Sequence, residues 1–330
     1  MGLDTTKLAA VLATSLSLCA ASAAAASPAS ADYPRQTVRL IVPYAAGGMT
    51  DLVARIVGQK LGEGLGQAVV VENKPGASTI TGADFVAGAR PDGYTLLVAT
   101  NTTLTINPWL YKNLRYDAQK SFTPIALVAK APSVIVVNPK VPANNIGELV
   151  ELASARPGSL SYASYGNGSS AHLAGEMLRS RAGIAVLHVP YRGSAPAKTA
   201  TMSGEVSMTF EPAFTAAPLI KSGQLKPIAL MGDKRSPALP DVPTVAEVGY
   251  PGMDMQAWVG FVAPANVPDG IVARLAAEIR KVMADPEVQA KLIGSGAEPV
   301  GYYQQDFTAY MRDESARYKT VIEQAGIRAE

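Results

Sequence analysis

The sequence predicts an α/β protein of two lobes, with mostly parallel sheets flanked by helices and a ligand cleft between the lobes. Short apolar runs alternate with helical patterns along most of the chain, which is the pattern of parallel sheets covered by helices. Two of the predicted strands also lead through a glycine turn into a helix. The length of 330 residues, with 48% hydrophobic residues, allows one large or two ordinary domains.

The first 31 residues have the pattern of a secretory signal peptide. Lys7 precedes an apolar run over 8–18, and an alanine-rich stretch then ends at Ala31. We therefore expect an exported protein that is cleaved near Ala31.

Two alternatives to a cleaved signal stay open. The stretch 8–26 is about long enough to span a bilayer, although its alanines and serines make it a weak membrane helix. Lipidation at Cys19 is the second alternative, but Leu18 stands where a small residue is favoured. Cys19 is the only cysteine, so the chain after Ala31 contains none and its stability depends on core burial rather than disulfides.

The charge balance argues against nucleic acid as a partner. The formal net charge is +2, and it stays +2 without residues 1–31, which hold one lysine and one aspartate. Neither a basic block nor basic residues interleaved with aromatic ones occur, and these are the usual footprint of nucleic-acid binding.

The alternation of strands and helices continues from end to end. Predicted strands cover 38–42, 68–71, 95–99, 125–128, 134–137, a short run from 160, 185–189, 206–210, 225–230 and 256–262. Predicted helices cover 50–61, 80–89, 146–155, 170–181, 195–202, 268–283 and 304–325.

Prolines suggest where the chain passes between lobes. Pro132 precedes one predicted strand, and a proline cluster over 237–251 precedes another. Lobe 1 would then contain residues 33–131 and 256–330, and lobe 2 residues 132–255.

The first glycine turn is predicted to bind an anion through the backbone. The strand 38–42 is followed by Tyr44, Gly47 and Gly48, and a helix then begins near Thr50. Glycine lets a ligand approach the main chain, and Thr50 can cap the helix, whose N-terminus favours negative charge. An ordinary strand-to-helix connection is the alternative.

The second glycine turn repeats this pattern at Gly166 and Gly168, before the helical run 170–181. The two turns fall in different lobes, so they would face each other across the cleft and clamp one anion. The G-x-G-x-x-A spacing also fits a dinucleotide site, but that site needs an acidic residue about 20 positions later. Val189 to Arg192 stand there instead.

Support for an enzyme or a metal site is thin. Ser169 and His172 lie three residues apart without a clear third group, and no G-x-S-x-G elbow occurs. His172, Glu176 and His188 could be drawn as a metal trio, but their spacing is not a known ligand motif, and a packed or solvated role is favoured.

Polar residues at the ends of predicted strands are further candidates for ligand binding. Glu211 directly follows the strand 206–210, and Thr102 and Thr103 follow the strand 95–99, where cleft residues lie in α/β proteins. Glu211 either receives an amine or hydroxyl of a ligand or is a solvated acid. Arg192 could pair with a carboxylate, and Trp258 could line the cleft or belong to the core.

The chain resembles the solute-binding proteins of tripartite tricarboxylate transporters, the Bug family, over positions 33–330. The matching motifs occur in family order: Tyr33-Pro34, RLIVPYAAGG at 39–48, TD at 50–51, VVENKPGA at 70–77, RPDGYTL at 90–96, HLAGE at 172–176, HVPYRG at 188–193, LPDVPT at 239–244 and WVG at 258–260. So many ordered motifs are far more specific than a single glycine turn.

This resemblance implies a periplasmic binding protein of the type II-like class, expected to be a monomer, that closes on a small organic acid and delivers it to membrane transporter components. It implies no catalysis, cofactor or metal. The residues expected to bind the ligand are Tyr44, Gly48, Met49, Thr50, Asp51, Thr102, Ser164, Asn167, Gly168, Ser169 and Glu211.

Some positions depart from the family pattern and leave the ligand open. Met49, Tyr165 and Glu211 stand at variable places, Lys74 replaces the commoner arginine, and residues 77–79 replace a more glycine-rich run. Glu211 favours an amino acid or hydroxy acid, with a dicarboxylate as the rival. A cleft enzyme acting on a carboxylate, or a receptor feeding a sensor, are the alternative functions.

Overall fold

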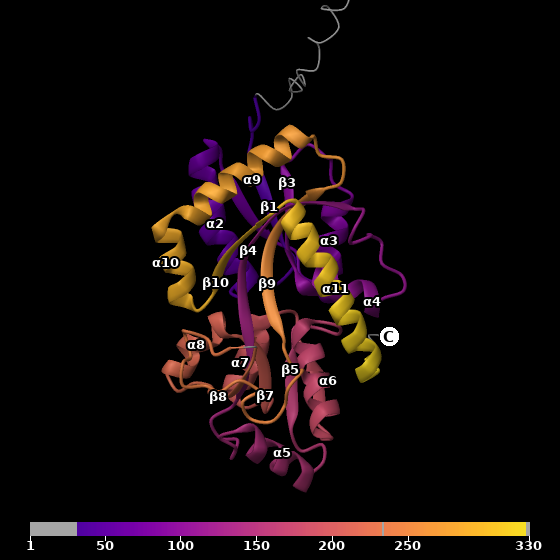
Figure 1. The fold of residues 1–330 in the computed structure, drawn as a ribbon, viewed down its shortest axis with the longest axis vertical. Coiled ribbons are helices and arrows are strands. Elements are labelled where there is room, and N and C mark those ends of the chain that lie inside the picture. The colour runs from indigo at the N-terminus through magenta and orange to yellow at the C-terminus, as the bar shows by residue number, and fades with distance from the viewer. Residues whose placement is uncertain (1–31, 233, 328–330) are drawn as a thin grey trace, which may run out of the picture.

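The computed structural model describes residues 32–232 and 234–327, which form two lobes stacked along the longest axis (Figure 1). The predicted signal peptide lies outside these residues. Lobe 1 contains β1 (Val38–Val42), α2 (Met49–Leu65), β2 (Val69–Asn73), η2 (Ala77–Thr79), α3 (Ile80–Ala87), β3 (Thr95–Thr100), η3 (Thr102–Ile106), α4 (Asn107–Leu110), α9 (Asp269–Ala284), α10 (Pro286–Ser295) and β10 (Glu298–Tyr303).

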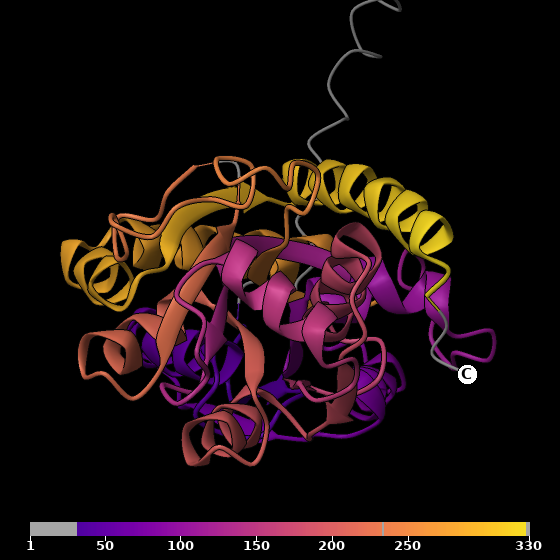
Figure 2. The ribbon, with the colours of Figure 1, turned by 90° about the horizontal axis from the view of Figure 1, so that it is seen from below.

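Lobe 2 lies below lobe 1 in Figure 1 and in front of it in the view from below (Figure 2). It contains α5 (Ile146–Ala155), β5 (Ser161–Ser164), α6 (Ser170–Ala182), β6 (Leu187–Pro190), α7 (Ser194–Ser203), β7 (Met208–Pro212), α8 (Ala213–Lys221) and β8 (Lys226–Met231). Three elements extend along both lobes: β4 (Phe122–Val137), β9 (Gln256–Pro264) and α11 (Gln305–Ala325).

One mixed sheet runs through both lobes in the order β2-β1-β3-β9-β4-β7-β5-β6. The expected parallel pairing is present inside each lobe, where β1 pairs with β2 and β3, and β5 pairs with β6 and β7. The pairs made by β4 and β9 are antiparallel. Parallel pairs come from strand-helix-strand units, whereas β9 lies between β3 and β4 and runs against both.

The strand β4 is longer than the sequence predicts. The runs 125–128 and 134–137, expected as two strands separated at Pro132, belong to one strand of 16 residues. Pro132 stays within the ladder opposite Gln256, because the fixed φ of proline is compatible with extended backbone. The proline therefore marks the passage between lobes without ending the strand.

Most other predicted elements are present with bounds shifted by a few residues, but α8, α10, β10 and the η3–α4 segment were not predicted. Pro218 lies inside α8 and obscures its helical pattern. The η3 segment is a π-helix rich in threonine, a residue with low helix propensity.

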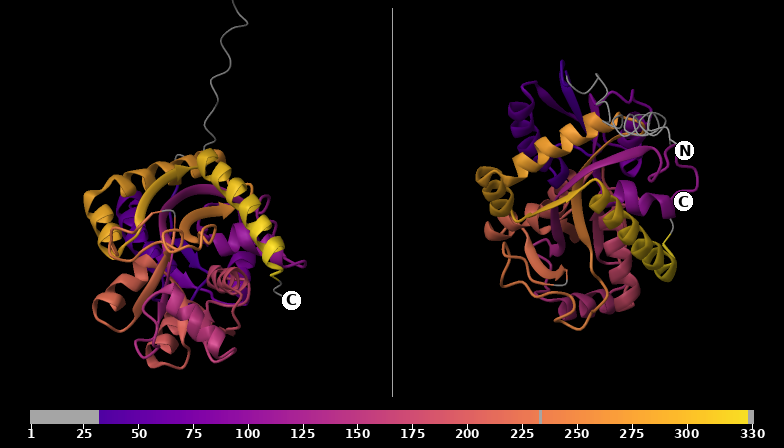
Figure 3. Two further views of the ribbon diagram at one scale, coloured as in Figure 1. Left: turned by 60° about the horizontal axis from the view of Figure 1, so that its bottom comes forward. Right: turned by 45° about the horizontal axis from the view of Figure 1, so that its top comes forward.

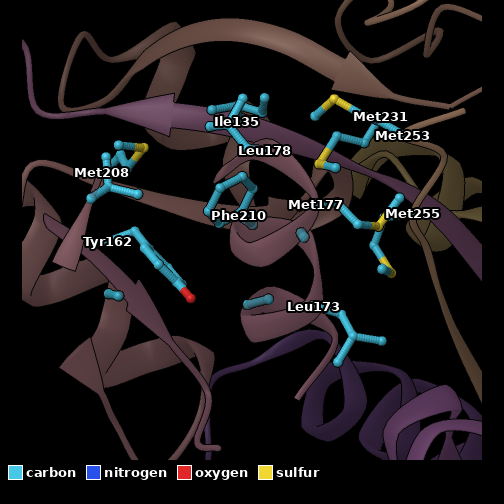
Figure 4. Close-up of a cluster of buried hydrophobic side chains, with 14 of the residues drawn as sticks. Ile135, Tyr162, Leu173, Met177, Leu178, Met208, Phe210, Met231, Met253 and Met255 are labelled. Carbon is cyan, nitrogen blue, oxygen red and sulfur yellow. The ribbon is translucent and has the colours of Figure 1, made fainter. Parts of the chain in front are cut away.

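The core of lobe 2 forms where α6 packs over β5 and β7. Tyr162 and Phe210 are buried there with their rings perpendicular and their centroids 5.6 Å apart. Figure 4 shows both rings among methionine and aliphatic side chains of the same cluster. This packing fixes the carboxyl ends of β5 and β7.

The helix α11 connects the cores of the two lobes. Phe307, near its start, packs against Trp258 with ring centroids 5.5 Å apart. Tyr318 and Ile322, in its second half, belong to the cluster that contains Tyr162 of lobe 2. Figure 3 shows α11 running from lobe 1 toward α6 in both views. The C-terminal helix therefore packs with both lobes rather than with lobe 1 alone.

Among the helices of the described residues, none is both long and apolar enough to cross a membrane.

Substitution of Gly175 by alanine should destabilise the protein, although alanine is the better helix former. A Cβ at Gly175 would lie 2.3 Å from the Tyr162 ring, and such overpacking costs about 1–3 kcal/mol. The matched control is Gly294→Ala in α10, where a Cβ meets no atom within 4 Å and a gain of roughly 0.5–1 kcal/mol is expected. Urea unfolding of both variants measures the difference, and equal shifts would contradict the packing described here.

Candidate functional site

Three helices direct their N-termini at one small cavity between the lobes. We call it the inner cavity. It is lined by Tyr44, Gly48, Met49, Thr50, Thr100, Asn101, Tyr165, Ser170, Ser194, Pro212, Ala257, Trp258 and Val259. The first residues of α2, α6 and α7, namely Met49, Ser170 and Ser194, are all in this set. The two turns predicted from sequence therefore meet, and α7 adds a third.

The inner cavity is small. Its volume is about 30 Å³, with room for about one or two water molecules. A Cβ placed on Gly48 of lobe 1 would lie 3.5 Å from Ser194 Cβ of lobe 2. The lobes are thus in contact, and a larger ligand has to enter while they are apart.

The first turn is shaped by Gly47 and Gly48, as predicted. Gly47 has a φ of +89° and Gly48 is the N-cap of α2. Thr50 is not the cap that the sequence suggested, because the helix starts one residue earlier at Met49. Thr50 lies instead in the first turn of the helix, where it lines the inner cavity.

Asp51 holds this turn from behind. Its Oδ2 accepts hydrogen bonds from Gly47 N at 3.1 Å and Arg55 Nε at 3.0 Å, and its Oδ1 accepts from Asn73 Nδ2 at 2.9 Å. Burial raises the pKa of Asp51, but these hydrogen bonds outweigh that effect and hold the pKa below its ordinary value. Asp51 does not line the inner cavity, so its contacts are those of a positioning residue.

The second turn uses Gly166 and Gly168, with φ of +124° and +75°. Ser169 is the N-cap of α6, and its Oγ accepts a hydrogen bond from His172 N at 3.3 Å. Gly168 N donates to His172 Nδ1 at 2.9 Å. The turn therefore depends on an unprotonated Nδ1 of His172.

The two histidines are stacked under this turn, with ring centroids 4.2 Å apart. Ser164 Oγ lies 2.6 Å from His188 Nε2. Burial and then the neighbouring His172 lower the pKa of His188 to about 4. Burial lowers the pKa of His172 as well, although Glu176 opposes the shift. Both rings are neutral at pH 7.

This arrangement does not form the catalytic or metal groups considered from sequence. Ser169 bonds the backbone of His172 and not its ring. Ser164 contacts the ring of His188 but is fully buried and does not line the inner cavity. Over residues 32–232 and 234–327, no three histidine, cysteine or acidic side chains are grouped as metal ligands would be.

Glu211 lies behind the wall of the inner cavity. Its Oε2 accepts hydrogen bonds from Ser194 Oγ at 2.7 Å and Thr215 Oγ1 at 3.0 Å, while Oε1 is buried with no hydrogen-bond partner among the described residues. Complete burial raises the pKa of Glu211, with Lys198 opposing this effect. A proton is best placed on Oε1, since an unpaired buried oxyanion is costly. Glu211 therefore supports Ser194 rather than lining the cavity.

Tyr44 and Tyr165 line the inner cavity and also a second, larger space. Their rings are perpendicular with centroids 6.5 Å apart. Both also line a groove of about 450 Å³, which we call the outer groove. Its other lining residues are Pro43, Gly76, Ala77, Ser78, Thr79, Tyr111, Gly166, Asn167, Pro190, Tyr191 and Arg192.

Two of the expected site residues tie the lobes together. The Thr102 Oγ1 accepts a hydrogen bond from Ser170 N at 3.2 Å, and the Asn167 carbonyl accepts from the Tyr111 hydroxyl at 2.6 Å. Both bonds cross between lobe 1 and lobe 2, so they belong to the closed arrangement.

Several lining residues were missed by the sequence reasoning. Ser194 could have been found, because Gly193-Ser194 repeats the strand-glycine-helix pattern between β6 and α7. Thr100, Asn101 and Tyr165 carry no such signal. Trp258 was expected either to line the cleft or to belong to the core, and it has both positions. It is fully buried and it lines the inner cavity, and its ring N–H donates a hydrogen bond to Glu314.

Comparison with known proteins places this geometry in context. Residues 53–327 match the family model of the tripartite tricarboxylate transporter family receptor. A UPF0065 protein of Bordetella pertussis is 38% identical over 304 residues, covering 92% of this chain and 94% of that protein.

Two solved structures are similar along nearly their whole length. The R. palustris protein Rpa4515 with adipate has a TM-score of 0.87 and 34% identity, covering 90% of this chain and 99% of that one. The periplasmic binding protein BugD has a TM-score of 0.87 and 36% identity, with the same coverage of 90% and 99%. The two-lobed fold is therefore that of a periplasmic binding protein.

Acid should destabilise the protein through the histidine stack. His188 and His172 have folded pKa values below the unfolded value of 6.5, so the unfolded chain binds protons first as the pH falls. Stability should decline from about pH 6.5 toward pH 4, by on the order of 1–2 kcal/mol for His188 after allowance for its partial exposure. The groups facing the stack are Glu176, Arg179 and Tyr162.

The variant His188→Asn tests this expectation against the wild type. Urea unfolding at pH 7.5, 6, 5 and 4 should show a shallower decline for the variant, because one titrating group is gone. An unchanged pH slope would contradict the assignment of His188 as a buried neutral histidine.

Proposed function

This chain belongs to the tripartite tricarboxylate transporter receptor family, the Bug family, and we propose that it captures a small organic carboxylate between its lobes for delivery to a membrane transporter. The observation that carries the proposal is the meeting of three helix N-termini at the inner cavity. A helix N-terminus carries about half a positive charge, and its first backbone N–H groups have no partner within the helix. At α6, Ser170 N already donates to Thr102 Oγ1.

The lining of the inner cavity suits a carboxylate that must be released again. Its described residues supply hydroxyls and one amide, from Tyr44, Thr50, Thr100, Asn101, Tyr165, Ser170 and Ser194, and neither a cationic nor an acidic side chain. Ser194, Tyr165 and Asn101 donate to Glu211 and to the Phe210 and Gln256 carbonyls. The attraction for a carboxylate would therefore come from the backbone dipoles and the remaining hydroxyls, without a fixed ion pair. A carboxylate group bound at this point would leave the rest of the ligand directed toward the outer groove.

A dicarboxylate is the ligand class that we favour over an amino acid or hydroxy acid. The similar protein Rpa4515 was solved with adipate. Glu211, which was expected to receive an amine or hydroxyl, accepts from Ser194 and Thr215 at Oε2 and is not among the lining residues of the inner cavity. Because burial raises the pKa of Glu211 and so favours its neutral form, Glu211 repels a nearby anion only weakly.

The route and partners follow from the sequence and the family. We propose that the signal peptide is cleaved near Ala31 and that the protein is exported to the periplasm. There it would act as a monomer and dock to the membrane components of a tripartite tricarboxylate transporter. A receptor leaves its ligand unchanged, so incubation with the bound acid followed by chromatography distinguishes it from a cleft enzyme. A partner that senses the ligand is the alternative recipient.

Thermal unfolding of the mature protein should identify the ligand class. A ligand at about 100 times its dissociation constant adds roughly 2.7 kcal/mol of stability, which raises the midpoint by several degrees. The panel contains dicarboxylates, hydroxy acids, amino acids, aromatic acids and matched uncharged amides. We expect a shift with dicarboxylates and none with the amides, whereas a flat response to every acid would refute the carboxylate site.

Substitution of Glu211 by glutamine should change affinity without changing preference. Glu211 acts on the ligand through Ser194, so all ligands should weaken by a similar factor of roughly 2–10, the usual scale of one hydrogen bond. Calorimetry with Glu211→Gln measures this across the panel. Selective loss of amino acids or hydroxy acids would show instead that Glu211 reads a donor on the ligand.

A further inference from the structure

The carboxyl group of Glu314 is buried behind the wall of the inner cavity. Glu314 lies near the middle of α11, and its side chain is 3% exposed. It does not line the cavity itself. Taking an ionisable group out of water costs free energy unless its oxygens are paired, so the place of Glu314 beside the ligand site calls for an explanation.

Four side chains surround this carboxyl group. Its Oε2 accepts a hydrogen bond from the Trp258 ring N–H, and Thr105 Oγ1 lies 2.9 Å from the same oxygen. Its Oε1 accepts from the Tyr310 hydroxyl at 3.2 Å and lies 3.8 Å from Arg317 Nη2. Burial raises the pKa of Glu314, and these four neighbours oppose the shift, Trp258 most strongly. Both oxygens are therefore paired.

The Trp258 ring, which lines the inner cavity, is held from behind by α11. Its only polar atom donates to Glu314 rather than to a residue of the cavity wall. Phe307 and Tyr310, also on α11, pack edge-on against the ring with centroids 5.5 Å and 6.4 Å away. One hydrogen bond and two aromatic contacts from the same helix therefore fix this part of the wall.

Glu314 also reaches η3, the π-helix that bonds to the other lobe. Thr105, inside η3, places its Oγ1 2.9 Å from Glu314 Oε2 and 2.9 Å from the Asn101 carbonyl oxygen. The first residue of η3 is Thr102, whose Oγ1 accepts the hydrogen bond from Ser170 N of lobe 2. Turns of π-helix are rare and frequently lie at functional sites. One carboxyl group thus contacts both the cavity wall and the segment that joins the lobes.

Tyr318 extends this support by one helical turn. It lies four residues after Glu314, a spacing that puts both side chains on one face of α11. Its hydroxyl accepts a hydrogen bond from Asn101 Nδ2 at 3.2 Å, and Asn101 lines the inner cavity. Two lining residues, Trp258 and Asn101, are therefore bonded to the same face of the C-terminal helix.

We propose that Glu314 is a positioning residue for ligand binding, which fixes the Trp258 ring at the wall of the inner cavity and, through Thr105, the part of η3 that brings Thr102 to Ser170. Glu314 acts through these residues and does not touch the ligand. Its removal should weaken the binding of an acid and the bond between the lobes together. The effect on affinity rests on the proposed function, whereas the effects on Trp258 and Ser170 can be measured without ligand.

The first test uses the Trp258 indole N–H as its reporter. The chain contains two tryptophans, so Trp109→Phe leaves Trp258 with the only indole N–H signal in a nitrogen-15 NMR spectrum. In this background we compare Glu314→Ala, which removes the acceptor, with Glu314→Gln, which keeps an acceptor oxygen. The signal should move upfield in Glu314→Ala and stay near its original position in Glu314→Gln.

The second test follows amide hydrogen exchange at Ser170. The first N–H groups of a helix have no partner within the helix, so the Ser170 amide depends on Thr102 Oγ1 of the other lobe. Its exchange should become several-fold faster in Glu314→Ala and in Thr105→Val. The Leu173 amide, which bonds to the Ser169 carbonyl inside lobe 2, is the internal reference and should keep its rate.

The third test is calorimetry with adipate, succinate and acetate. Glu314→Ala should weaken the acids that bind by roughly tenfold, the upper scale of one hydrogen bond, and Glu314→Gln should restore most of the affinity. The matched control is Glu278→Ala on α9, which removes another buried carboxylate that pairs with Arg274 and Lys281 and lines neither space of the cleft. It should lower stability but keep the indole signal, the Ser170 rate and the affinity.

Three results would overturn the inference. An unchanged affinity in Glu314→Ala, or equal losses in Glu278→Ala, would reduce Glu314 to a group that only stabilises the fold. If Glu314→Ala does not fold, an unchanged Ser170 rate in Thr105→Val would refute the link through η3. No binding of any acid by the wild type would refute the proposed function instead, and the indole signal and the Ser170 rate would still decide whether Glu314 positions the cavity wall.

Discussion

The antiparallel pairing of β4 with β9 is the constraint on which the site depends. The two strands stay paired from Phe122 opposite Pro264 to Pro132 opposite Gln256, across the passage from lobe 1 to lobe 2. This ladder joins the lobes at the passage between them, so α2 of lobe 1 stays within reach of α6 and α7 of lobe 2. Without it, three helix N-termini on separate lobes would have no reason to meet at one cavity.

The local features of the site could be predicted from the sequence. The turns at Gly47-Gly48 and Gly166–Gly168 were recognised because glycine after a strand and before a helix is a signal confined to a few neighbouring residues. The alternation of strands and helices predicted the two-lobed α/β fold, and the ordered motifs predicted the family. Gly193-Ser194 also follows a strand and precedes a helix, so this third turn could have been predicted from the sequence in the same way.

Other features depend on contacts between distant parts of the chain. Glu211 was predicted as a cleft residue because it ends a strand, but pairing of Glu211 with Val134 and packing of Ser194 turn it into the protein interior. Asp51 is drawn behind the first turn by Asn73, which lies on β2. Ser78, whose φ of 50° is left-handed, is likewise held by Asn107 from another element. Contacts of this kind, between residues far apart in the chain, cannot be predicted from the local spacing of residue types.

The absence of a cationic side chain from the described lining of the inner cavity has a consequence for the conditions under which the protein works. At ordinary ionic strength, ions in solution largely screen attractions between exposed charges more than about 8–10 Å apart, but they screen buried groups much less. Backbone dipoles that hold an anion among buried residues such as Asn101 and Trp258 are screened less in this way. The affinity of the inner cavity for an anion should therefore vary little with salt concentration. Such a property suits a receptor outside the cytoplasm, where the salt concentration follows that of the surroundings.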